Sequence, residues 1–302
     1  MSLKTISLTV LLGAMPLLAN NALLQGLTTI VDTAETQKAE DQQVLNNAFK
    51  QRMKTQRMAR DALLIAMDFN RSFYQKDILK NADEFNIKFQ NLINDKKDID
   101  KVITKLPEFK EKLTTFKTTW SQFYDMIKAL SKDPKDQKAL NYIINQNTNL
   151  LQDIDYIFSN FLRFYQSNDS LEKSMNHIRT MLFTQVGKPR MYITKIVKER
   201  LLIAEDINTT ANQKALHKSI KNMDQLMKAL KEGDKTLELN GTEDRKILEK
   251  LAQSQTVWEK LKVAIASATL DPHQWEKILQ LNEDFIKIHN DVVTLTKASV
   301  DN

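Results

Sequence analysis

Apolar residues recur at intervals of three and four positions along most of this chain, a spacing that places them on one face of an α-helix. The pattern is clear after Asp133-Pro134 and again after Asp271-Pro272. An Asp that caps a helix, followed by a Pro in the first turn, is typical of a helix start. We therefore predict a long helix after each pair. Their apolar positions are Leu140, Ile143, Ile144, Leu150, Ile154, Ile157 and Phe161 in the first and Ile278, Leu281, Phe285, Ile288, Val292 and Leu295 in the second.

Three further helices are predicted before the first of these. A long helix carries residues 52–66, a shorter one carries Phe85 and Phe89, and a third carries Trp120 as a core anchor. The 302 residues include only 5 Gly and 5 Pro, which is too few turn residues for a β-sandwich or a β-barrel. We predict an all-α fold with four helices in each half, joined by short polar links.

A repeat divides the chain into two similar parts. The segment RMKTQRMARDALLIA, which starts at Arg52, returns as RMYITKIVKERLLIA from Arg190. The offset of 138 residues (190 − 52) is that of a domain and far exceeds a solenoid repeat. We predict an internal duplication that gives two tandem four-helix bundles, residues 20–168 and 169–302. Residues matched at this offset include Asp68 and Asp206, Asn70 and Asn208, Trp120 and Trp258, Asp133 and Asp271, and Asp153 and Asp291.

Residues 1–19 have the features of a signal peptide. Lys4 precedes the apolar run TISLTVLLGAMPLLA, and Ala19 is a plausible cleavage residue. The run is shorter than the ~20 apolar residues that span a bilayer, and we find no other candidate span. We expect a soluble protein in a bacterial periplasm, without a membrane span after signal removal. Since the chain has no Cys, helix packing must hold it together without disulfides.

Arg52 occupies an unusual position on the first long helix. On a helical wheel at about 100° per residue, it lies in the middle of the apolar arc, which Gln56 shares. Arg190 has the same central position in the second copy. The other basic residues of the first copy fall at or beyond the far edge of the arc: Lys50, Lys54, Arg57 and Arg60.

A charge in a bundle core is costly unless it is compensated. Two explanations stay open for Arg52 and Arg190. A carboxylate of the same bundle could neutralise each arginine, with Asp153 and Asp291 as the obvious candidates. Alternatively, each guanidinium could hold a bound anion, since its parallel N–H groups suit planar oxyanions.

Composition and motifs exclude several other functions. The 44 basic and 38 acidic residues give a net charge of +6 spread over a mixed surface, unlike the basic stripe of a nucleic-acid-binding protein. No nucleophile, acid/base pair or phosphate-binding loop is recognisable. We predict no enzymatic activity, no metal, no cofactor and no nucleic-acid partner. The histidines lack metal-ligand spacing and are expected at the surface; they are His177, His217, His273 and His289.

The segment NNAFKQRMKTQRMARDALLIA (46–66) resembles the motif of the PilJ-type domain, the N-terminal sensory domain of type IV pili methyl-accepting chemotaxis transducers. It is also similar to the conserved helix of the periplasmic domains of nitrate/nitrite sensor kinases. The resemblance implies four-helix bundles, single or doubled, in which the arginine of the Arg-Met pair contacts an anion. It therefore implies a ligand-binding role for Arg52, Met53 and Gln56, and for Arg190 and Met191 in the second copy.

These features together predict a periplasmic sensory module that binds a small oxyanion, similar to nitrate or nitrite, and presents it to a membrane-bound signalling protein. The resemblance implies such a partner, because family members usually continue into a signalling module and this sequence ends after the second copy. A homodimer is a further option, since related domains often pair across the first helix. The alternative is a non-catalytic structural or adaptor protein of the cell envelope, with Asp153 and Asp291 neutralising the arginines.

Overall fold

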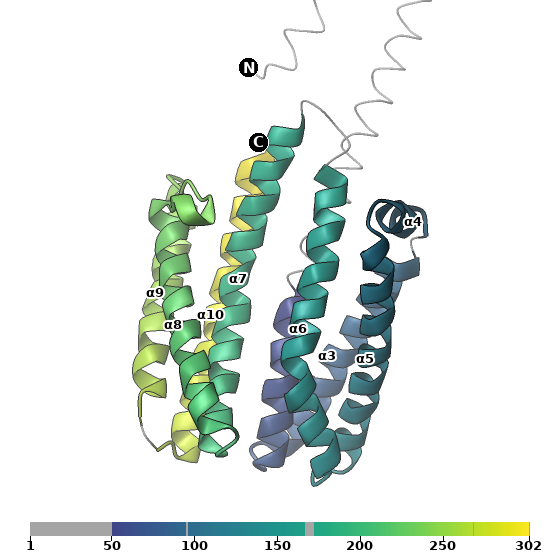
Figure 1. Cartoon of the computed structure of the whole chain (residues 1–302). Helices are drawn as coiled ribbons and strands as arrows, with labels where there is room; N and C mark the ends of the chain where they lie inside the picture. The colour runs from purple at the N-terminus through teal and green to yellow at the C-terminus, as the bar shows by residue number, and fades with distance from the viewer. Residues whose placement is uncertain (1–49, 95, 167–171, 268, 302) are drawn as a thin grey trace, which may run out of the picture. The chain divides into compact units, whose positions relative to one another are not determined.

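The computed structural model describes residues 50–94, 96–166, 172–267 and 269–301, and these residues are helical almost throughout (Figure 1). They contain no β-strand, and their extended pairing is limited to an isolated bridge between Asp234 and Leu239. The predicted all-α class is therefore confirmed. None of the described helices has an apolar stretch long enough to cross a membrane. The predicted signal peptide, residues 1–19, lies outside the described residues.

Short connections join the helices in both halves of the chain, which we call the first half (residues 50–166) and the second half (residues 172–301). A first helix spans residues 50–66. It is followed by α3 (Arg71–Asn94), α4 (Lys96–Lys105), α5 (Pro107–Lys132), α6 (Gln137–Gln166), α7 (Glu172–Ala204), α8 (Thr209–Glu232), the 3-10 helix η1 (Lys235–Leu237), α9 (Arg245–Ile265) and α10 (Pro272–Asp301).

The helices of the second half pack in a ring. Helix α7 contacts α8, α8 contacts α9, α9 contacts α10, and α10 returns to α7 (Figure 1). In the first half, α5 packs against α3, α4 and α6. The two halves meet where α6 contacts α7. This packing is compatible with two bundles, and the domain boundaries and the duplication stay predictions.

The 138-residue offset also relates the helix bounds and the backbone angles of the two halves. Adding it to the bounds of α3 gives those of α8, and adding it to the first residue of α5 gives that of α9. The turn before α3 holds Asp68 and Asn70 at φ 59° and 43°, and the turn before α8 holds Asp206 and Asn208 at φ 54° and 44°. Residues matched at this offset can therefore be compared as equivalent positions.

The predicted core anchors are confirmed in both halves. Trp120 and Trp258 are buried, and each indole nitrogen keeps a polar partner on the neighbouring helix. Trp120 Nε1 donates to Asn86 Oδ1 at 3.0 Å, and Trp258 Nε1 donates to Asp224 Oδ1 at 2.7 Å. The acceptors are themselves 138 residues apart (224 − 86), so the repeat includes this cross-helix hydrogen bond.

One of the two predicted helix starts is displaced. Helix α10 begins at Pro272, and Asp271 Oδ1 accepts from the backbone N of Gln274 at 2.8 Å, as expected for a cap. The expected start of α6 at Asp133-Pro134 is wrong, because α6 begins at Gln137. A second acidic residue, Asp136, caps that helix by accepting from the backbone N of Ala139 at 2.9 Å.

The turn before α8 gives a stability prediction. An L-residue at positive φ is strained, and glycine adopts this conformation without a Cβ clash. Asp206→Gly is therefore expected to raise the free energy of unfolding by up to about 1 kcal/mol, and Asp206→Val to lower it, because a β-branched side chain tolerates this region poorly. Urea denaturation of the two variants checks this, and a Val variant more stable than the Gly variant would contradict it.

Candidate functional site

Buried cations are concentrated on the two matched helices, the first helix and α7. Lysine and arginine are rarely buried in proteins unless they are paired. Here the residues that are at most 7% exposed are Arg52, Lys54 and Arg60 on the first helix and Arg190, Lys198 and Arg200 on α7. Each buried charge needs a neutralising group in the protein or in a ligand, so these two helices are the candidate site.

Arg52 is neutralised within the protein, but not by the expected residue. Its guanidinium forms an ion pair with Asp155 of α6. Burial raises the pKa of Asp155, and the charge of Arg52 opposes that shift. Asp153 is instead influenced by Lys112, so the suggestion that Asp153 pairs with Arg52 is wrong. Burial lowers the pKa of Lys188 of α7, and the nearby charge of Arg52 adds to this decrease.

Gln56 is buried and already has a partner. Its Oε1 accepts from Lys198 Nζ of α7 at 2.9 Å, and Asn147 Oδ1 of α6 accepts from the same ammonium at 2.9 Å. Asn147 Nδ2 in turn donates to the backbone O of Thr55 at 2.6 Å. This chain of bonds joins the first helix, α6 and α7. Gln56 therefore holds Lys198 in place.

The other two predicted site residues are methionines that are partly buried. Met53 packs against the apolar core, and Met191 is half-buried on α7. The five predicted site residues are not brought into one cluster, because Arg52 bonds to α6 while Arg190 bonds to α10.

Arg190 differs from Arg52 in having no carboxylate within ion-pair distance among the described residues. It is 3% exposed, its Nη1 donates to Asn290 Oδ1 of α10 at 2.7 Å, and its Nε donates to the backbone O of Gly187 at 3.5 Å. Its Nη2 is buried without an acceptor among the described residues. Burial lowers the pKa of this guanidinium to about 10. The residue matched to Asp155 is Val293, so the second half lacks that carboxylate.

The expected partner of Arg190 is engaged elsewhere. Asp291 Oδ2 accepts from Lys250 Nζ of α9 at 2.7 Å, so the suggestion that Asp291 neutralises Arg190 is wrong. His289 lies close enough to Arg190 to be affected by its charge. Burial and, to a smaller extent, the charge of Arg190 lower the pKa of His289 to about 3. The imidazole is therefore neutral near pH 7 and leaves the charge of Arg190 uncompensated.

His289 itself contradicts the expectation of a surface histidine. Its ring is fully buried and stacks on Phe285, with centroids 5.3 Å apart. Its Nε2 lies 2.9 Å from the backbone O of Val186, and its Nδ1 lies 3.4 Å from Ser254 Oγ. The spacing of four residues from Phe285 places it on the apolar face of α10, and this signal was present in the sequence.

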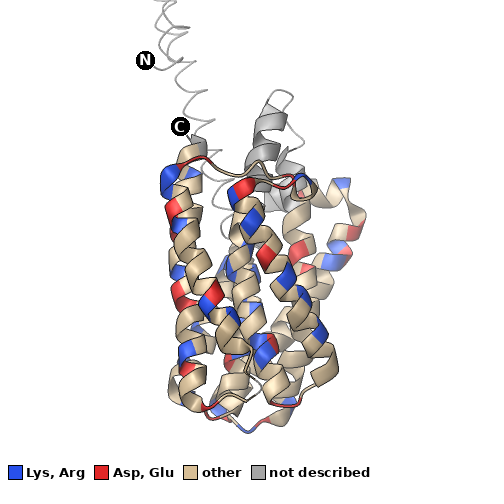
Figure 2. Cartoon of the chain, turned by 90° about the vertical axis from the view of Figure 1, so that its left-hand side faces the viewer, with Lys and Arg blue, Asp and Glu red and all other residues tan. Residues whose placement is uncertain are grey.

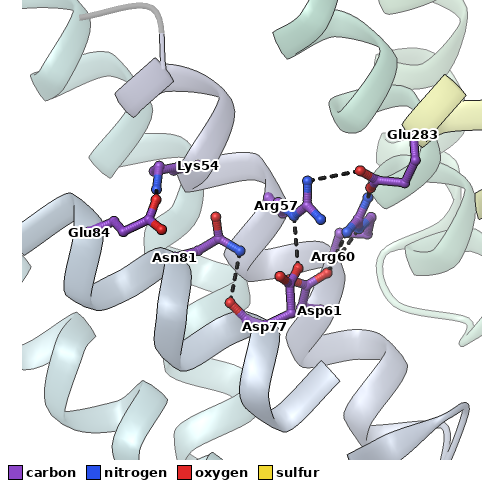
Figure 3. A network of polar contacts seen from close by, with 8 residues as sticks. All are labelled: Lys54, Arg57, Arg60, Asp61, Asp77, Asn81, Glu84 and Glu283. Atoms are coloured by element: carbon purple, nitrogen blue, oxygen red, sulfur yellow. Dashed lines mark hydrogen bonds and ion pairs between the residues drawn. The ribbon is translucent and has the colours of Figure 1, made fainter. Parts of the chain in front are cut away.

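A network of charges joins the first helix to α10 of the second half (Figure 3). Glu283 accepts from Arg60 Nη1 at 2.9 Å and from Arg57 Nη1 at 3.0 Å. Arg60 Nε and Nη2 donate to Asp61 Oδ1 at 2.9 and 2.8 Å, and Arg57 Nε donates to Asp77 Oδ2 of α3 at 2.8 Å. We call these five residues the paired network. Two arginines share three carboxylates there, so this part of the interface neutralises itself.

The paired network perturbs the ionisation of its carboxyl groups. Burial raises the pKa of Asp61 to about 7, because it outweighs the favourable charge of Arg60, and the nearby carboxylate of Asp77 adds to the rise. The pKa of Asp77 moves down, because Arg57 and the hydrogen bond to Asp61 outweigh the cost of burial. Of these two carboxyl groups, Asp61 is therefore the one that retains a proton up to about neutral pH.

Other kinds of site find no support in the described residues. They contain no group of three His, Asp or Glu side chains that could hold a metal ion. On the face shown in Figure 2, the positions of basic and acidic residues are interspersed along the helices and form no stripe of one sign. Comparison with protein-family models, with curated proteins and with solved structures finds no match to this chain. The likeness to PilJ-type domains therefore stays a prediction from residues 46–66.

The raised pKa of Asp61 predicts a pH dependence of stability. In the unfolded chain this carboxyl has the ordinary pKa of an aspartate, 3.8, whereas in the folded protein it retains the proton up to about pH 7. Its stabilising contribution is complete below pH 3.8 and is lost as the pH rises through 7. The free energy of unfolding should fall over this range, by at most about 1.4 kcal/mol per pH unit from this group.

The matching variant is Asp61→Asn, which cannot titrate and keeps the shape of the side chain. Urea denaturation at several values from pH 5 to pH 8 should show a shallower decline for this variant than for the wild type. Asp125→Asn, on the exposed side of α5, serves as the control and should reproduce the wild-type slope. Equal slopes for Asp61→Asn and the wild type would contradict the assignment.

Proposed function

We propose that this protein is a non-catalytic sensory module that binds a small oxyanion, similar to nitrate or nitrite, at Arg190. The observation that carries the proposal is the buried guanidinium of Arg190, which lacks a carboxylate partner among the described residues. Such a charge destabilises a helical core until a counter-charge reaches it. A planar oxyanion accepts two parallel hydrogen bonds from a guanidinium, so it would supply both the charge and the missing acceptor for Nη2.

The location and the partner belong to the same proposal. The apolar segment at residues 1–19 supports export to the periplasm, and the resemblance of residues 46–66 to PilJ-type domains supports a membrane-bound signalling protein as the receiver. Binding would then act on α7, which carries Arg190 and contacts α6 of the first half. A ligand at Arg190 is thus placed to influence how the two halves pack.

Arg52 supports the second candidate, a structural or adaptor protein of the cell envelope. Its charge is neutralised inside the protein by Asp155, as that hypothesis requires, although through a different aspartate from the one expected. The paired network also neutralises Arg57 and Arg60 without a ligand. The first half therefore favours an architectural role, and the second half favours anion binding.

Thermal unfolding in a series of sodium salts tests the proposal. Nitrate and nitrite should raise Tm above its value in chloride at the same ionic strength, because they bind only the folded state. For a protein of this size, each kcal/mol of stabilisation corresponds to about 2–4 °C. Arg190→Met should abolish the shift, and Arg190→Lys should weaken it, since lysine lacks the planar fork.

The control for general charge effects is Arg245→Met, because Arg245 is a cation of α9 whose side chain is 92% exposed. It should keep the full nitrate shift. The proposal fails if neither oxyanion shifts the wild-type Tm, or if the shift survives in Arg190→Met.

A second prediction concerns Arg190 without any ligand. Replacing an uncompensated buried cation with an apolar side chain of similar length removes its desolvation cost. In chloride buffer, Arg190→Met is therefore expected to raise the free energy of unfolding, on the order of 1 kcal/mol or more. Chemical denaturation measures the difference. A strongly destabilised variant would instead mean that internal bonds such as the one to Asn290 already satisfy the arginine.

A further inference from the structure

A cavity of about 320 Å³ lies beside Lys198, where the first helix and α6 meet α7 and α8. Its charged lining comes from Lys195, Lys198 and Glu199 of α7, and Asn145 of α6 and Ala215 of α8 also line it. Apolar side chains of the first helix, Ala59 and Leu63, form part of the opposite wall. Its volume falls at the lower end of the range of ligand pockets, about 300–1,000 Å³.

The 138-residue offset relates this cavity to the paired network of Figure 3. The members of the network are Arg57, Arg60, Asp61, Asp77 and Glu283, and the residues matched to them are, in the same order, Lys195, Lys198, Glu199, Ala215 and Asn145. All five matched residues line the cavity. The paired network and the cavity are therefore equivalent places in the interface between the halves. Charged side chains fill the first, and the second is hollow.

The two versions differ in two carboxylates. Asp77 and Glu283, which bond to the arginines of the network, correspond to Ala215 and Asn145. The network has two cations and three acidic residues, whereas the cavity has two cations and Glu199 as the acidic residue among the matched positions. The space that two carboxylate side chains fill in the network is therefore empty in the cavity, and their negative charge is absent there.

We propose that this cavity binds a small dicarboxylate, whose two carboxylates take the places that Asp77 and Glu283 occupy in the paired network. The chemistry follows from the side chains that the cavity retains. Lys195 and Lys198 supply the positive charge, and Ala59 and Leu63 pack against the carbon chain between the acid groups. The site is separate from Arg190, and its occupation does not depend on oxyanion binding there.

Both lysines keep a donor for such a ligand. An ammonium group has three N–H donors. Lys198 donates to Gln56 and Asn147 at 2.9 Å each, and Lys195 donates to Ser219 Oγ and pairs with Glu199 Oε1, both at 2.7 Å. One N–H of each ammonium is therefore left for an acceptor in the cavity.

Glu199 is the acidic side chain that lines the cavity, and it pairs with Lys195 at 2.7 Å. Burial lowers the pKa of Lys198 to about 8, so this amine is partly neutral in mildly alkaline solution. Binding should consequently take up protons near pH 8, and the affinity should fall as the pH rises.

Titration calorimetry and thermal unfolding of the full chain with sodium succinate test the proposal. Succinate should bind with saturation and raise Tm by several degrees relative to chloride at equal ionic strength, whereas succinamide, its neutral diamide, should do neither. Repeating the calorimetry at pH 8 in buffers of different ionisation enthalpy measures the proton uptake. Absence of a succinate effect in the wild type would overturn the proposal.

The decisive variant rebuilds the paired network in the cavity. Ala215→Asp combined with Asn145→Glu should raise the Tm of the free protein and eliminate the succinate shift, because the new side chains occupy the ligand's place. Should this variant not fold, Lys198→Gln removes the buried cation and should also lose the shift. Retention of the full shift in a folded variant of either kind would overturn the assignment.

The nitrate and succinate sites are distinguished by crossing ligands and variants. Arg190→Met should keep the succinate shift while losing the nitrate shift, and Lys198→Gln should do the reverse. If Arg190→Met loses both shifts, the two anions share one site and the separate cavity site is wrong.

Discussion

The guanidinium of Arg60, buried between Asp61 and Glu283, shows the constraint on which this structure depends: every buried charge needs a partner. The first helix and α7 carry several buried arginines and lysines, so the charges of these side chains must be neutralised within the interface between the halves. Glu283 reaches from α10 to Arg57 and Arg60 of the first helix, and Lys198 reaches from α7 to Gln56 and Asn147. Each half therefore completes the polar bonding of the other. Burial of a pair or network is stable only when every charge has a partner, and loss of one partner is costly.

The two halves satisfy this constraint to different degrees. Around the first helix, Asp155 pairs with Arg52, and three carboxylates, one of them Glu283 from α10 of the second half, surround Arg57 and Arg60. Around α7, the residue matched to Asp155 is Val293, and Ala215 of α8 and Asn145 of α6 stand where the network has two more carboxylates. The same backbone framework is thus neutralised around the first helix and short of negative charge around α7. This asymmetry is the physical basis for proposing anion binding at α7 and an architectural role for the first helix.

Periodicity predicted the parts of the structure that depend on one face of a helix. The all-α class, the buried Trp120 and Trp258, and the start of α10 follow from apolar spacing and capping residues. The helical-wheel prediction was wrong for Lys54 and Arg60, because it placed both at or beyond the edge of the apolar arc although both are buried. A wheel assumes that a helix has one buried face, whereas the first helix bonds to α3, to α6 and, across the interface, to α7 and α10.

The partners of Arg52 and Arg190 could not be predicted from the sequence, for a related reason. Asp153 and Asp155 are two positions apart on α6, so their side chains leave the helix in directions that differ by about 160°. Only the packing of α6 decides which of them faces Arg52. The substitution of Val293 for Asp155 was visible at the 138-residue offset, but it acquires meaning only once the ion pair of Arg52 is known. The cavity beside Lys198 likewise became interpretable after the structure of the paired network was compared with it.

We propose that an oxyanion reaches the uncompensated charge of Arg190, whereas Asp155 already neutralises Arg52. Nuclear magnetic resonance of the arginine side-chain nitrogens during a nitrate titration observes both guanidinium groups in one experiment. We expect the Nε and Nη signals of Arg190 to shift with saturation, while those of Arg52, held by Asp155, stay in place. Signals of Arg190 that do not move, or that drift linearly together with those of exposed arginines such as Arg245, would contradict it.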